Sequence, residues 1–290
     1  MTPGASAEAG SVRLGTPIGR GVLTTTILGS AMAFLDGTVV NIALPRIGHQ
    51  FGASLAGLQW TVTGYTLTLA AFVLVGGSLG DRFGRRKVFL IGVVWFALAS
   101  LACGLSPNLG FLITFRAVQG VGSALLTPGA LALIQSVFHP DDRAKAVGAW
   151  SGLASIAGAA GPLVGGWLIE YASWRWIFLI NLPLAVAVVA VALRYVPESR
   201  ELVIGHFDIP GAVLGALGLA GVTYALVEAG AKGLGSASVI ATAVAGVAAL
   251  VAFVLVERRS PAPMMPLSLF SSREFSAANA LTLKIGKAHV

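Results

Sequence analysis

The sequence predicts an all-α integral membrane protein, and three observations carry this prediction. Hydrophobic residues make up 56% of the 290 residues and charged residues only 11%, whereas a soluble domain has about 25% charged residues. The mean hydropathy is +0.85, so too few polar side chains exist to cover a soluble fold. The apolar residues also gather in runs of about 20, the length that crosses a bilayer as a helix.

We predict eight membrane-spanning helices joined by short segments that are rich in Gly, Pro, Asn and Asp. They are Gly21–Leu44, Gly57–Val75, Val88–Leu105, Leu109–Val137, Lys145–Ile169, Trp176–Tyr195, Ile209–Val227 and Ser238–Val256.

The first span, Gly21–Leu44, follows Arg13 and Arg20, so a cleaved secretory signal is the alternative. Its apolar stretch exceeds the roughly 7–15 residues of such a signal, and it lacks a clear A-x-A cleavage site. It also contains Asp36. We therefore predict a retained helix.

The following spans are bounded by turn-forming residues. The sequence SPN at 106–108 separates the third span from the fourth, and HPDD at 139–142 separates the fourth from the fifth. The sixth span begins at Trp176, the second tryptophan of WRW at 174–176. The seventh and eighth are nearly uninterrupted apolar runs.

The basic residues predict the orientation, because loops on the cytoplasmic side carry an excess of Lys and Arg. With the N-terminus in the cytoplasm, the outer segments hold three bases, Arg46, Arg175 and Lys232. The inner segments hold thirteen: Arg13, Arg20, Arg82, Arg85, Arg86, Lys87, Arg143, Lys145, Arg194, Arg200, Arg258, Arg259 and Arg273. This pattern explains the net charge of +7 without nucleic acid, and it predicts a multi-pass protein of the cell membrane.

The stretch GGSLGDRFGRRKV at 76–88 is predicted to be the loop between the second and third spans. It fits the G-x-S-x-G pattern of a hydrolase, but a membrane helix precedes it instead of the required strand. The phosphate-binding G-x-x-x-x-G-K-[ST] pattern fails because Val88 follows Lys87. A purely topogenic basic loop and a lipid-headgroup patch stay open as alternatives.

This stretch closely resembles the loop signature of the major facilitator superfamily. Three further stretches resemble the drug:proton antiporter branch of that superfamily, whose members have fourteen helices. They are FLDGTVVNIALP at 34–45, RAVQGVGSALLTP at 116–128, and GAAGPLVGGWL at 158–168 followed by WRWIFLINLP at 174–183.

The resemblance implies a division of the chain. Residues 1–20 would be a cytoplasmic tail, 21–195 an N-terminal six-helix bundle, 196–208 a cytoplasmic linker, and 209–256 two inserted helices. Residues 257–290 would be a cytoplasmic segment with the truncated start of a ninth helix.

The resemblance also implies roles for two groups of residues. In the gating loop Asp81 would latch the two halves of a transporter on the cytoplasmic side. The other loop residues would be Gly77, Gly80, Arg82, Gly84, Arg85 and Arg86. The antiporter motif of the fifth span would comprise Gly158, Gly161, Pro162, Gly165 and Gly166.

Asp36 and Arg116 are ionisable residues inside apolar spans, where a charge costs at least about 2.5–3.5 kcal/mol. A carboxyl in a low-dielectric site favours its neutral form, so Asp36 could take up and release a proton. Counted from Leu44 and Leu109, both residues lie about 11–12 Å below the outer surface at about 1.5 Å per residue. If the two helices face one cavity, the two side chains could interact directly or through water. Packing or helix capping for Asp36, and snorkelling for Arg116, are the structural alternatives.

In the fifth span, Gly158, Gly161 and Gly165 fall within about 60° on a helical wheel. Such a smooth face lets another helix approach closely, and Pro162 favours a bend. Ordinary small-residue packing is compatible with the same motif.

These observations lead to two functional hypotheses. The first is a proton-coupled exporter of amphipathic or cationic drug-like compounds, with Asp36 and Arg116 coupling protons to substrate. Asn41, Trp60, Tyr65 and Gln119 are candidate cavity residues, although packing explains each of them equally well. The second is a non-transporting half-transporter that is inert or acts only as a membrane binding partner.

An enzyme is not expected, because no nucleophile–base pair is evident. No cofactor or metal is expected either, since the four histidines are scattered and Cys103 is the only cysteine.

The C-terminal residues depart from the resemblance. Lys284 and Lys287 stand where the middle of a ninth span should lie, which suggests a reading-frame change or a truncated gene, with a short natural tail as the alternative. A second six-helix bundle would be missing, unless homodimerisation restored the two-bundle architecture.

Overall fold

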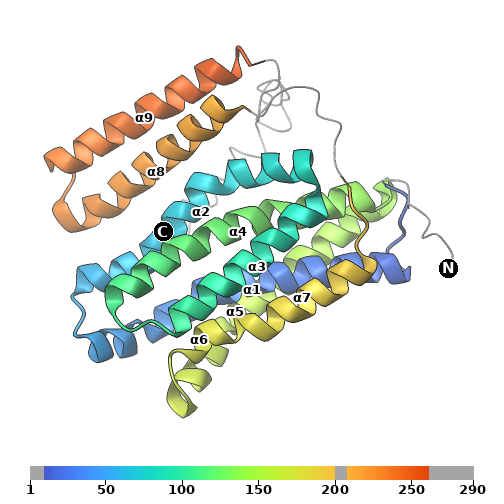
Figure 1. Cartoon of the computed structure of the whole chain (residues 1–290), viewed down its shortest axis with the longest axis horizontal. Coiled ribbons are helices and arrows are strands. Elements are labelled where there is room, and N and C mark those ends of the chain that lie inside the picture. Colours follow the sequence, from blue (N-terminus) through green and yellow to red (C-terminus); the bar gives the residue numbers. More distant parts are fainter. Residues whose placement is uncertain (1–9, 200–207, 261–290) are drawn as a thin grey trace.

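The computed structural model describes residues 10–199 and 208–260 of the chain. Within these ranges it contains nine helices (Figure 1). They are α1 (Pro17–Phe51), α2 (Leu55–Phe83), α3 (Arg85–Gly104), α4 (Leu109–Val137), α5 (Pro140–Tyr171), α6 (Trp176–Leu179), α7 (Asn181–Tyr195), α8 (Ile209–Lys232) and α9 (Ala237–Glu257).

The predicted number of spans is confirmed for the described residues. Eight helical stretches are long and apolar enough to cross a membrane, and α6 and α7 together form one of them, Trp176–Tyr195. The predicted ninth span after Arg273, and Lys284 and Lys287, lie outside the described residues.

Several helices extend beyond the ends of the predicted spans. α1 begins at Pro17, with the Thr16 side chain capping the Gly19 N–H, and continues through Pro45 to Phe51. α5 begins at Pro140 rather than Lys145. Apolar runs mark only the part of a helix that lies in lipid, whereas backbone hydrogen bonds continue the helix into water.

The largest correction concerns the predicted loop at 76–88, which is almost entirely helical. α2 extends to Phe83 and α3 starts at Arg85, so only Gly84 separates them. Gly84 has φ +111°, and a Cβ there would come within 2.8 Å of the Glu198 carboxylate. A side chain is therefore excluded on both conformational and steric grounds.

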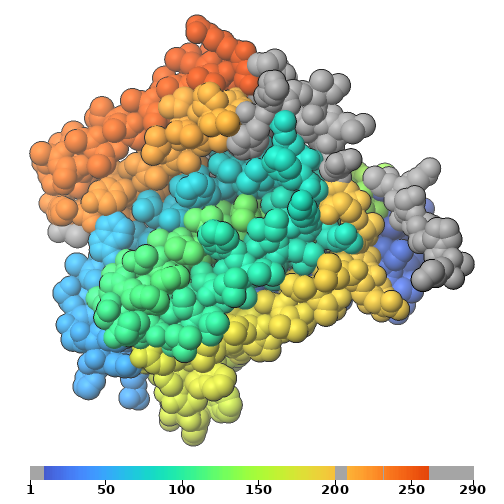
Figure 2. Space-filling view, viewed as in Figure 1, coloured from blue at the N-terminus to red at the C-terminus, as the bar shows by residue number. Residues whose placement is uncertain are grey.

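Helices α1–α7 form one bundle, and α8 and α9 form an antiparallel pair beside it (Figures 1 and 2). The pair packs on α2 through α8. The rings of Trp60 and Tyr224 lie 5.6 Å apart at this contact. Between α8 and α9 the backbones meet closely, since a Cβ on Gly246 would lie 2.6 Å from the Val222 nitrogen.

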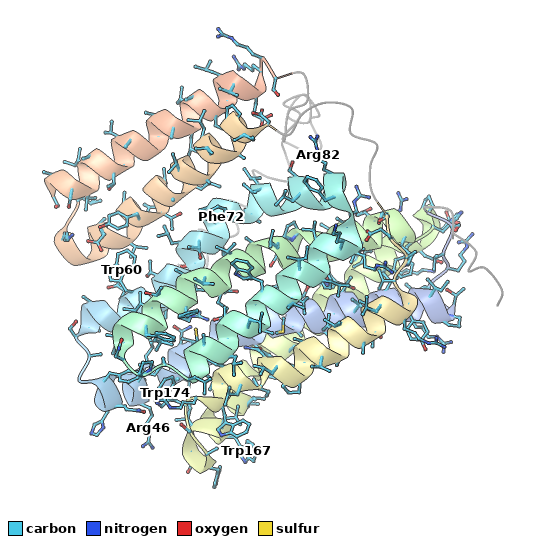
Figure 3. All side chains as sticks on the ribbon, in the orientation of Figure 1. Arg46, Trp60, Phe72, Arg82, Trp167 and Trp174 are labelled. Atoms are coloured by element: carbon cyan, nitrogen blue, oxygen red, sulfur yellow. The ribbon has the colours of Figure 1, made fainter. Side chains whose placement is uncertain are left out.

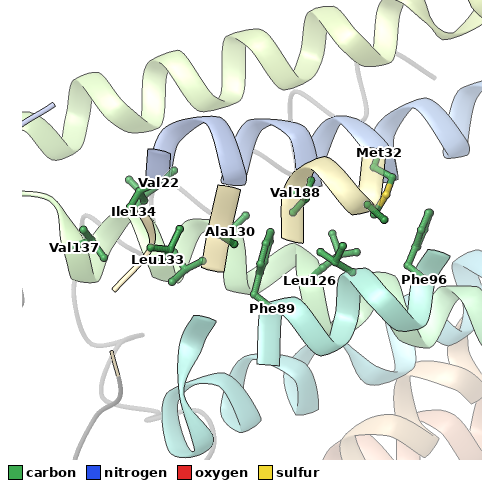
Figure 4. Close-up of a cluster of buried hydrophobic side chains, with 14 of the residues drawn as sticks. Val22, Met32, Phe89, Phe96, Leu126, Ala130, Leu133, Ile134, Val137 and Val188 are labelled. Atoms are coloured by element: carbon green, nitrogen blue, oxygen red, sulfur yellow. The ribbon is translucent and has the colours of Figure 1, made fainter. Parts of the chain in front are cut away.

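The bundle has two buried apolar clusters. One contains Met32, Phe89 and Phe96, which are labelled in Figure 4, and the other contains Ile47 and Phe178. Large apolar side chains such as those of Leu98 and Leu163 are instead exposed on the outside, where a membrane protein contacts lipid tails.

Glycines allow α4 to pack closely against α2 and α3. A Cβ on Gly76 would overlap the Ala124 carbonyl, and one on Gly122 would lie 2.7 Å from the Phe96 nitrogen. Small residues of this kind are typical of helix contacts in membranes.

Residues before α1 are tied to the junction of α4 and α5. Val12 is 6% exposed, its N–H donates to the Val137 carbonyl at 3.2 Å, and its carbonyl accepts from the His139 N–H at 3.0 Å. Arg13 also forms an ion pair with Asp141 at 3.2 Å. Part of the predicted N-terminal tail is therefore packed against the bundle.

Candidate functional site: a buried polar centre

Asp36 of α1 and Arg116 of α4 form an ion pair inside the bundle. Each residue is only 1% exposed. The two residues predicted to lie at equal depth are thus in direct contact, with Nη1 of Arg116 donating to Oδ2 of Asp36. Because both charges are removed from water, each depends on the other for compensation.

Gln119 connects the two charges. It lies one helical turn after Arg116 and is fully buried. Its Nε2 donates to Oδ1 of Asp36 at 2.9 Å, and its Oε1 accepts from Nη1 of Arg116 at 2.7 Å. A single amide therefore satisfies one atom of the acid and one of the base.

Asn181, in the first turn of α7, is the second amide at this centre. Its Nδ2 lies 3.4 Å from Oδ1 of Asp36 and donates to the Ser100 hydroxyl at 2.9 Å. Ser100 in turn donates to the Phe178 carbonyl at 2.9 Å. These contacts join α1, α3, α6 and α7.

Aromatic rings cover the guanidinium of Arg116. Its central carbon lies 4.3 Å from the centre of the Tyr65 ring and 5.8 Å from that of Phe178. The Tyr65 hydroxyl donates to Ser123 at 2.8 Å, which fixes the ring. Cation–π contacts of a desolvated cation contribute about 2 kcal/mol each.

We define the polar centre as Asp36, Ser100, Arg116, Gln119 and Asn181. It is enclosed by packed helices, and of the two interactions considered from the sequence, direct or through water, the two charged side chains make the direct one. Sequence alone does not show which face of α1 turns inward, because Asp36 has apolar neighbours in both directions along the chain.

The four candidate cavity residues separate into two groups. Tyr65 and Gln119 surround the ion pair. Asn41 is exposed and donates to the carbonyl of Gly37 at 3.1 Å, and Trp60 contacts Tyr224 of α8. Figure 3 shows Trp60 on the side of α2 that faces α8.

The predicted gating residues lie at the opposite end of the bundle from Arg46, Trp167 and Trp174, as the position of Arg82 shows (Figure 3). Asp81, the last acid of α2, pairs with Arg85 of α3 at 2.7 Å, so this pair bridges the break at Gly84. Gly77 and Gly80 have room: a Cβ on Gly77 would lie 3.8 Å from Pro128, and no described atom lies within 4 Å of one on Gly80.

Glu198, which follows α7, fixes the start of α3. Its two carboxylate oxygens accept from the backbone N–H groups of Arg86 at 3.0 Å and Lys87 at 3.1 Å. The Arg86 guanidinium also donates to the Val196 carbonyl at 2.9 Å. An acid at a helix N-terminus stabilises the unpaired N–H groups there.

Three glycines of the predicted antiporter motif face α1. A Cβ on Gly158 would lie 3.3 Å from Phe34, one on Gly165 would lie 2.7 Å from Val39, and one on Gly161 would overlap the Thr38 hydroxyl. That hydroxyl contacts the Gly158 carbonyl at 3.1 Å. Gly166 lies off this face, and Pro162 is exposed within the uninterrupted helix α5.

We expect Gly161→Ala to lower stability and Gly166→Ala to have little effect. At 161 the new methyl displaces Thr38 and separates α1 from α5, at a cost of about 1–3 kcal/mol for overpacking. At 166 no described atom lies within 4 Å of the added Cβ. Thermal unfolding of both variants in detergent measures the difference, and equal midpoints for the two would contradict the close α1–α5 packing.

Comparison with known proteins identifies the family of this chain. The family model of the Major Facilitator Superfamily matches residues 26–271. The chain belongs to the major facilitator superfamily. The resemblance of the four sequence stretches is therefore confirmed at the level of the family.

Several curated relatives of this superfamily member have names that refer to drug resistance. Multidrug resistance protein Stp of Mycobacterium tuberculosis (strain CDC 1551 / Oshkosh) is 39% identical over 89% of the chain and 48% of its own length. The tetracenomycin C resistance and export protein of Streptomyces glaucescens is 38% identical over 89% and 48%. The chain thus spans about half the length of these relatives.

Solved structures share the fold of this superfamily member. A peptide transporter POT in complex with sulfate has a TM-score of 0.62 at 16% identity, covering 89% of this chain and 56% of that one. A bacterial homolog of the lysosomal transporter Spinster, in an inward-facing and occupied conformation, has a TM-score of 0.51 at 22% identity, covering 88% and 65%.

Sequence reasoning did not identify Ser100, Asn181 and Glu198 as site residues. Asn181 and Ser100 were detectable as polar residues inside apolar spans, and Asn181 also stands in the stretch WRWIFLINLP. Glu198 carries no such signal, because an acid in a polar connecting segment is common.

Proposed function

We propose that this chain provides the N-terminal half of a proton-coupled exporter of amphipathic or cationic drug-like compounds. The observation that carries the proposal is the buried ion pair between Asp36 and Arg116. An acid that is desolvated inside a membrane bundle and balanced by one cation changes its partner when it binds a proton. Such a change is what coupling of proton movement to helix movement requires.

The names of the relatives support the substrate class. They refer to resistance to multiple drugs and to resistance to and export of tetracenomycin C. The face of α5 that packs on α1 through Gly158, Gly161 and Gly165 agrees with the proposed antiporter role of that motif, because it brings α5 close to the helix that bears Asp36.

We propose the cell membrane as the location, with the N-terminus in the cytoplasm. The excess of bases in the inner segments supports this orientation. It places the end of the bundle with Asp81 and Arg85 in the cytoplasm, where Asp81 would act as the latch. Asp81 is 40% exposed despite its ion pair, so a partner can still reach it.

The proposed division of the chain treats 21–195 as one bundle of a two-bundle transporter. Transporters of this architecture bind their substrate between two repeats, so export requires a second bundle. A C-terminal half or a second copy of this chain would supply it, with Asn41 on the exposed face of α1 among the residues available to a shared cavity.

The proposal is tested with the chain reconstituted in lipid vesicles under an imposed proton gradient. We expect a fluorescent amphipathic cation to move against its own gradient, and movement to stop when a protonophore removes the proton gradient. Vesicles without protein are the control for leakage.

Absence of movement with a correctly folded chain would favour the second hypothesis, a half-transporter that acts only as a binding partner. Cross-linking in the same vesicles distinguishes the forms of the proposal. A transporting preparation that is entirely monomeric would contradict the need for a second bundle.

A further inference from the structure

In the side-chain amide of Asn181 the nitrogen has hydrogen-bond partners, but the oxygen has none among the described residues. The residue is 1% exposed, and its Nδ2 contacts Oδ1 of Asp36 at 3.4 Å and Oγ of Ser100 at 2.9 Å. Its Oδ1 is buried and has no hydrogen-bond partner among the described residues. An unpartnered acceptor is thus part of the same amide that touches the proposed proton-carrying acid.

The ionised and protonated forms of Asp36 need different partners. A carboxylate only accepts hydrogen bonds, whereas a protonated carboxyl must also donate one. In the ionised form Asp36 accepts from Arg116, Gln119 and Asn181. The three donor nitrogens, Nη1 of Arg116, Nε2 of Gln119 and Nδ2 of Asn181, cannot accept the hydrogen of a protonated Asp36.

The other side-chain oxygens of the two amides and of Ser100 already accept a hydrogen bond. Oε1 of Gln119 accepts from Arg116 at 2.7 Å and lies 3.8 Å from the Cys103 thiol. Oγ of Ser100 accepts from Asn181 at 2.9 Å. Within the polar centre, Oδ1 of Asn181 is the buried side-chain acceptor that remains without a donor.

We propose that Asn181 turns its side-chain amide when Asp36 binds a proton, donating to the ionised carboxylate and accepting from the protonated carboxyl. The inference rests on the proposed function, in which Asp36 carries the proton. Asn181 is then a positioning residue: the proton enters on Asp36, and the amide selects the hydrogen-bond pattern that follows.

The turn exchanges two atoms of nearly equal size, so the surrounding helices need not move. After the turn Nδ2, instead of Oδ1, is the atom of Asn181 without a hydrogen-bond partner. The number of hydrogen bonds that the amide makes therefore stays nearly the same. The charge state of Asp36 therefore decides the orientation. The Ser100 hydroxyl, which now donates to the Phe178 carbonyl at 2.9 Å, can then donate to the turned oxygen.

When Ser100 moves its hydrogen bond from the Phe178 carbonyl to Asn181, protonation of Asp36 affects the junction between α6 and α7. Releasing the Phe178 carbonyl changes the bonding of α6, a helix of four residues that ends next to Ile180. The other titratable groups that face Asp36 are Arg116 of α4, Tyr65 of α2 and Cys103 of α3. Arg116 has no acceptor atom, while the Tyr65 hydroxyl is bonded to Ser123 and the Cys103 thiol contacts Gln119.

Infrared difference spectroscopy of the whole chain in lipid vesicles tests the inference without any transport. The carbonyl band of protonated Asp36 is isolated as the pH-dependent signal that disappears in Asp36→Asn. In Asn181→Leu, which keeps a similar volume, we expect this band to shift to higher wavenumber because the carboxyl loses its acceptor. Asn108→Ser, at the exposed asparagine whose side chain caps the Phe111 N–H of α4, is the control and leaves the band in place, because serine also caps a helix.

A second measurement does not depend on a variant at position 181. In chain containing isotope-labelled asparagine, a side-chain amide band should shift with the same pH dependence as the Asp36 band, and the shift should vanish in Asp36→Asn. An unchanged asparagine signal, or an Asp36 band that is identical in Asn181→Leu, would overturn the inference.

The same spectra separate this inference from the proposed function. A protonated Asp36 band with a responding asparagine signal supports the inference even if no substrate moves. If Asp36 gives no protonated band at any pH, the inference and the proposed coupling role of Asp36 are both overturned.

Discussion

Replacing Asp36 with asparagine is expected to reduce proton-driven export to the level of vesicles without protein. Asparagine keeps the shape of the side chain and its contact with Gln119, but it cannot bind and release a proton in the working pH range. Because the variant also leaves the buried Arg116 without its anion, the amount of folded protein in the vesicles is measured beside export. Uptake of a fluorescent cation into vesicles with an imposed proton gradient measures the loss.

Asp141→Asn is the matched control for this experiment. Asp141 lies in the first turn of α5, its side chain is 69% exposed, and its ion pair with Arg13 is at the surface. We expect its removal to leave export unchanged. Full export by Asp36→Asn would remove Asp36 from the proposed coupling mechanism.

Replacing Arg116 with methionine is expected to cost about 3–5 kcal/mol of stability, since it leaves a buried carboxylate without its cation. Methionine fills a similar apolar volume, so the loss reports on charge more than on packing. Gln119 would also lose the donor that its Oε1 now accepts from. Thermal or denaturant unfolding in detergent measures the change.

A second substitution separates charge from shape. In the double variant Asp36→Asn with Arg116→Met, no charge remains unpaired, so we expect much of the loss to be recovered and a clear coupling energy in the double-mutant cycle. Arg13→Met is the control. The Arg13 side chain is 52% exposed in its ion pair with Asp141, and exposed ion pairs contribute about 0–1 kcal/mol to stability. A cost for Arg116→Met no larger than for Arg13→Met would contradict the buried pair.

The spans were predictable because the cost of placing polar groups in lipid leaves a strong pattern in the sequence. The ends of α1, α2 and α5 were less predictable from the sequence. The stretch from Gly76 to Phe83 contains charges and glycines that suggest a loop, yet its backbone continues the hydrogen bonds of α2. Hydropathy describes the environment of a residue, whereas helix ends depend on local hydrogen bonds, such as the one from the Gly19 N–H to Thr16.

The candidate site was predictable where one residue carried the signal by itself. Asp36 and Arg116 are charges in apolar spans, and simple counting along two antiparallel helices placed them at one depth. Their burial was not predictable, since it depends on how far α1 is rotated about its axis. The contact with Asn181 was equally hidden, because it joins residues 145 positions apart.

The long separation between these partners has a consequence for biosynthesis. Asp36 enters the membrane with the first helix, but Arg116 follows 80 residues later and Asn181 follows 145 residues later. At about 5–20 residues per second for translation, the acid waits about 4–16 s for its cation and about 7–29 s for the second amide. During that interval the ribosome holds an unfinished chain whose first helix carries an uncompensated acid. Insertion machinery that shelters this helix until the fourth has been made would therefore favour correct assembly.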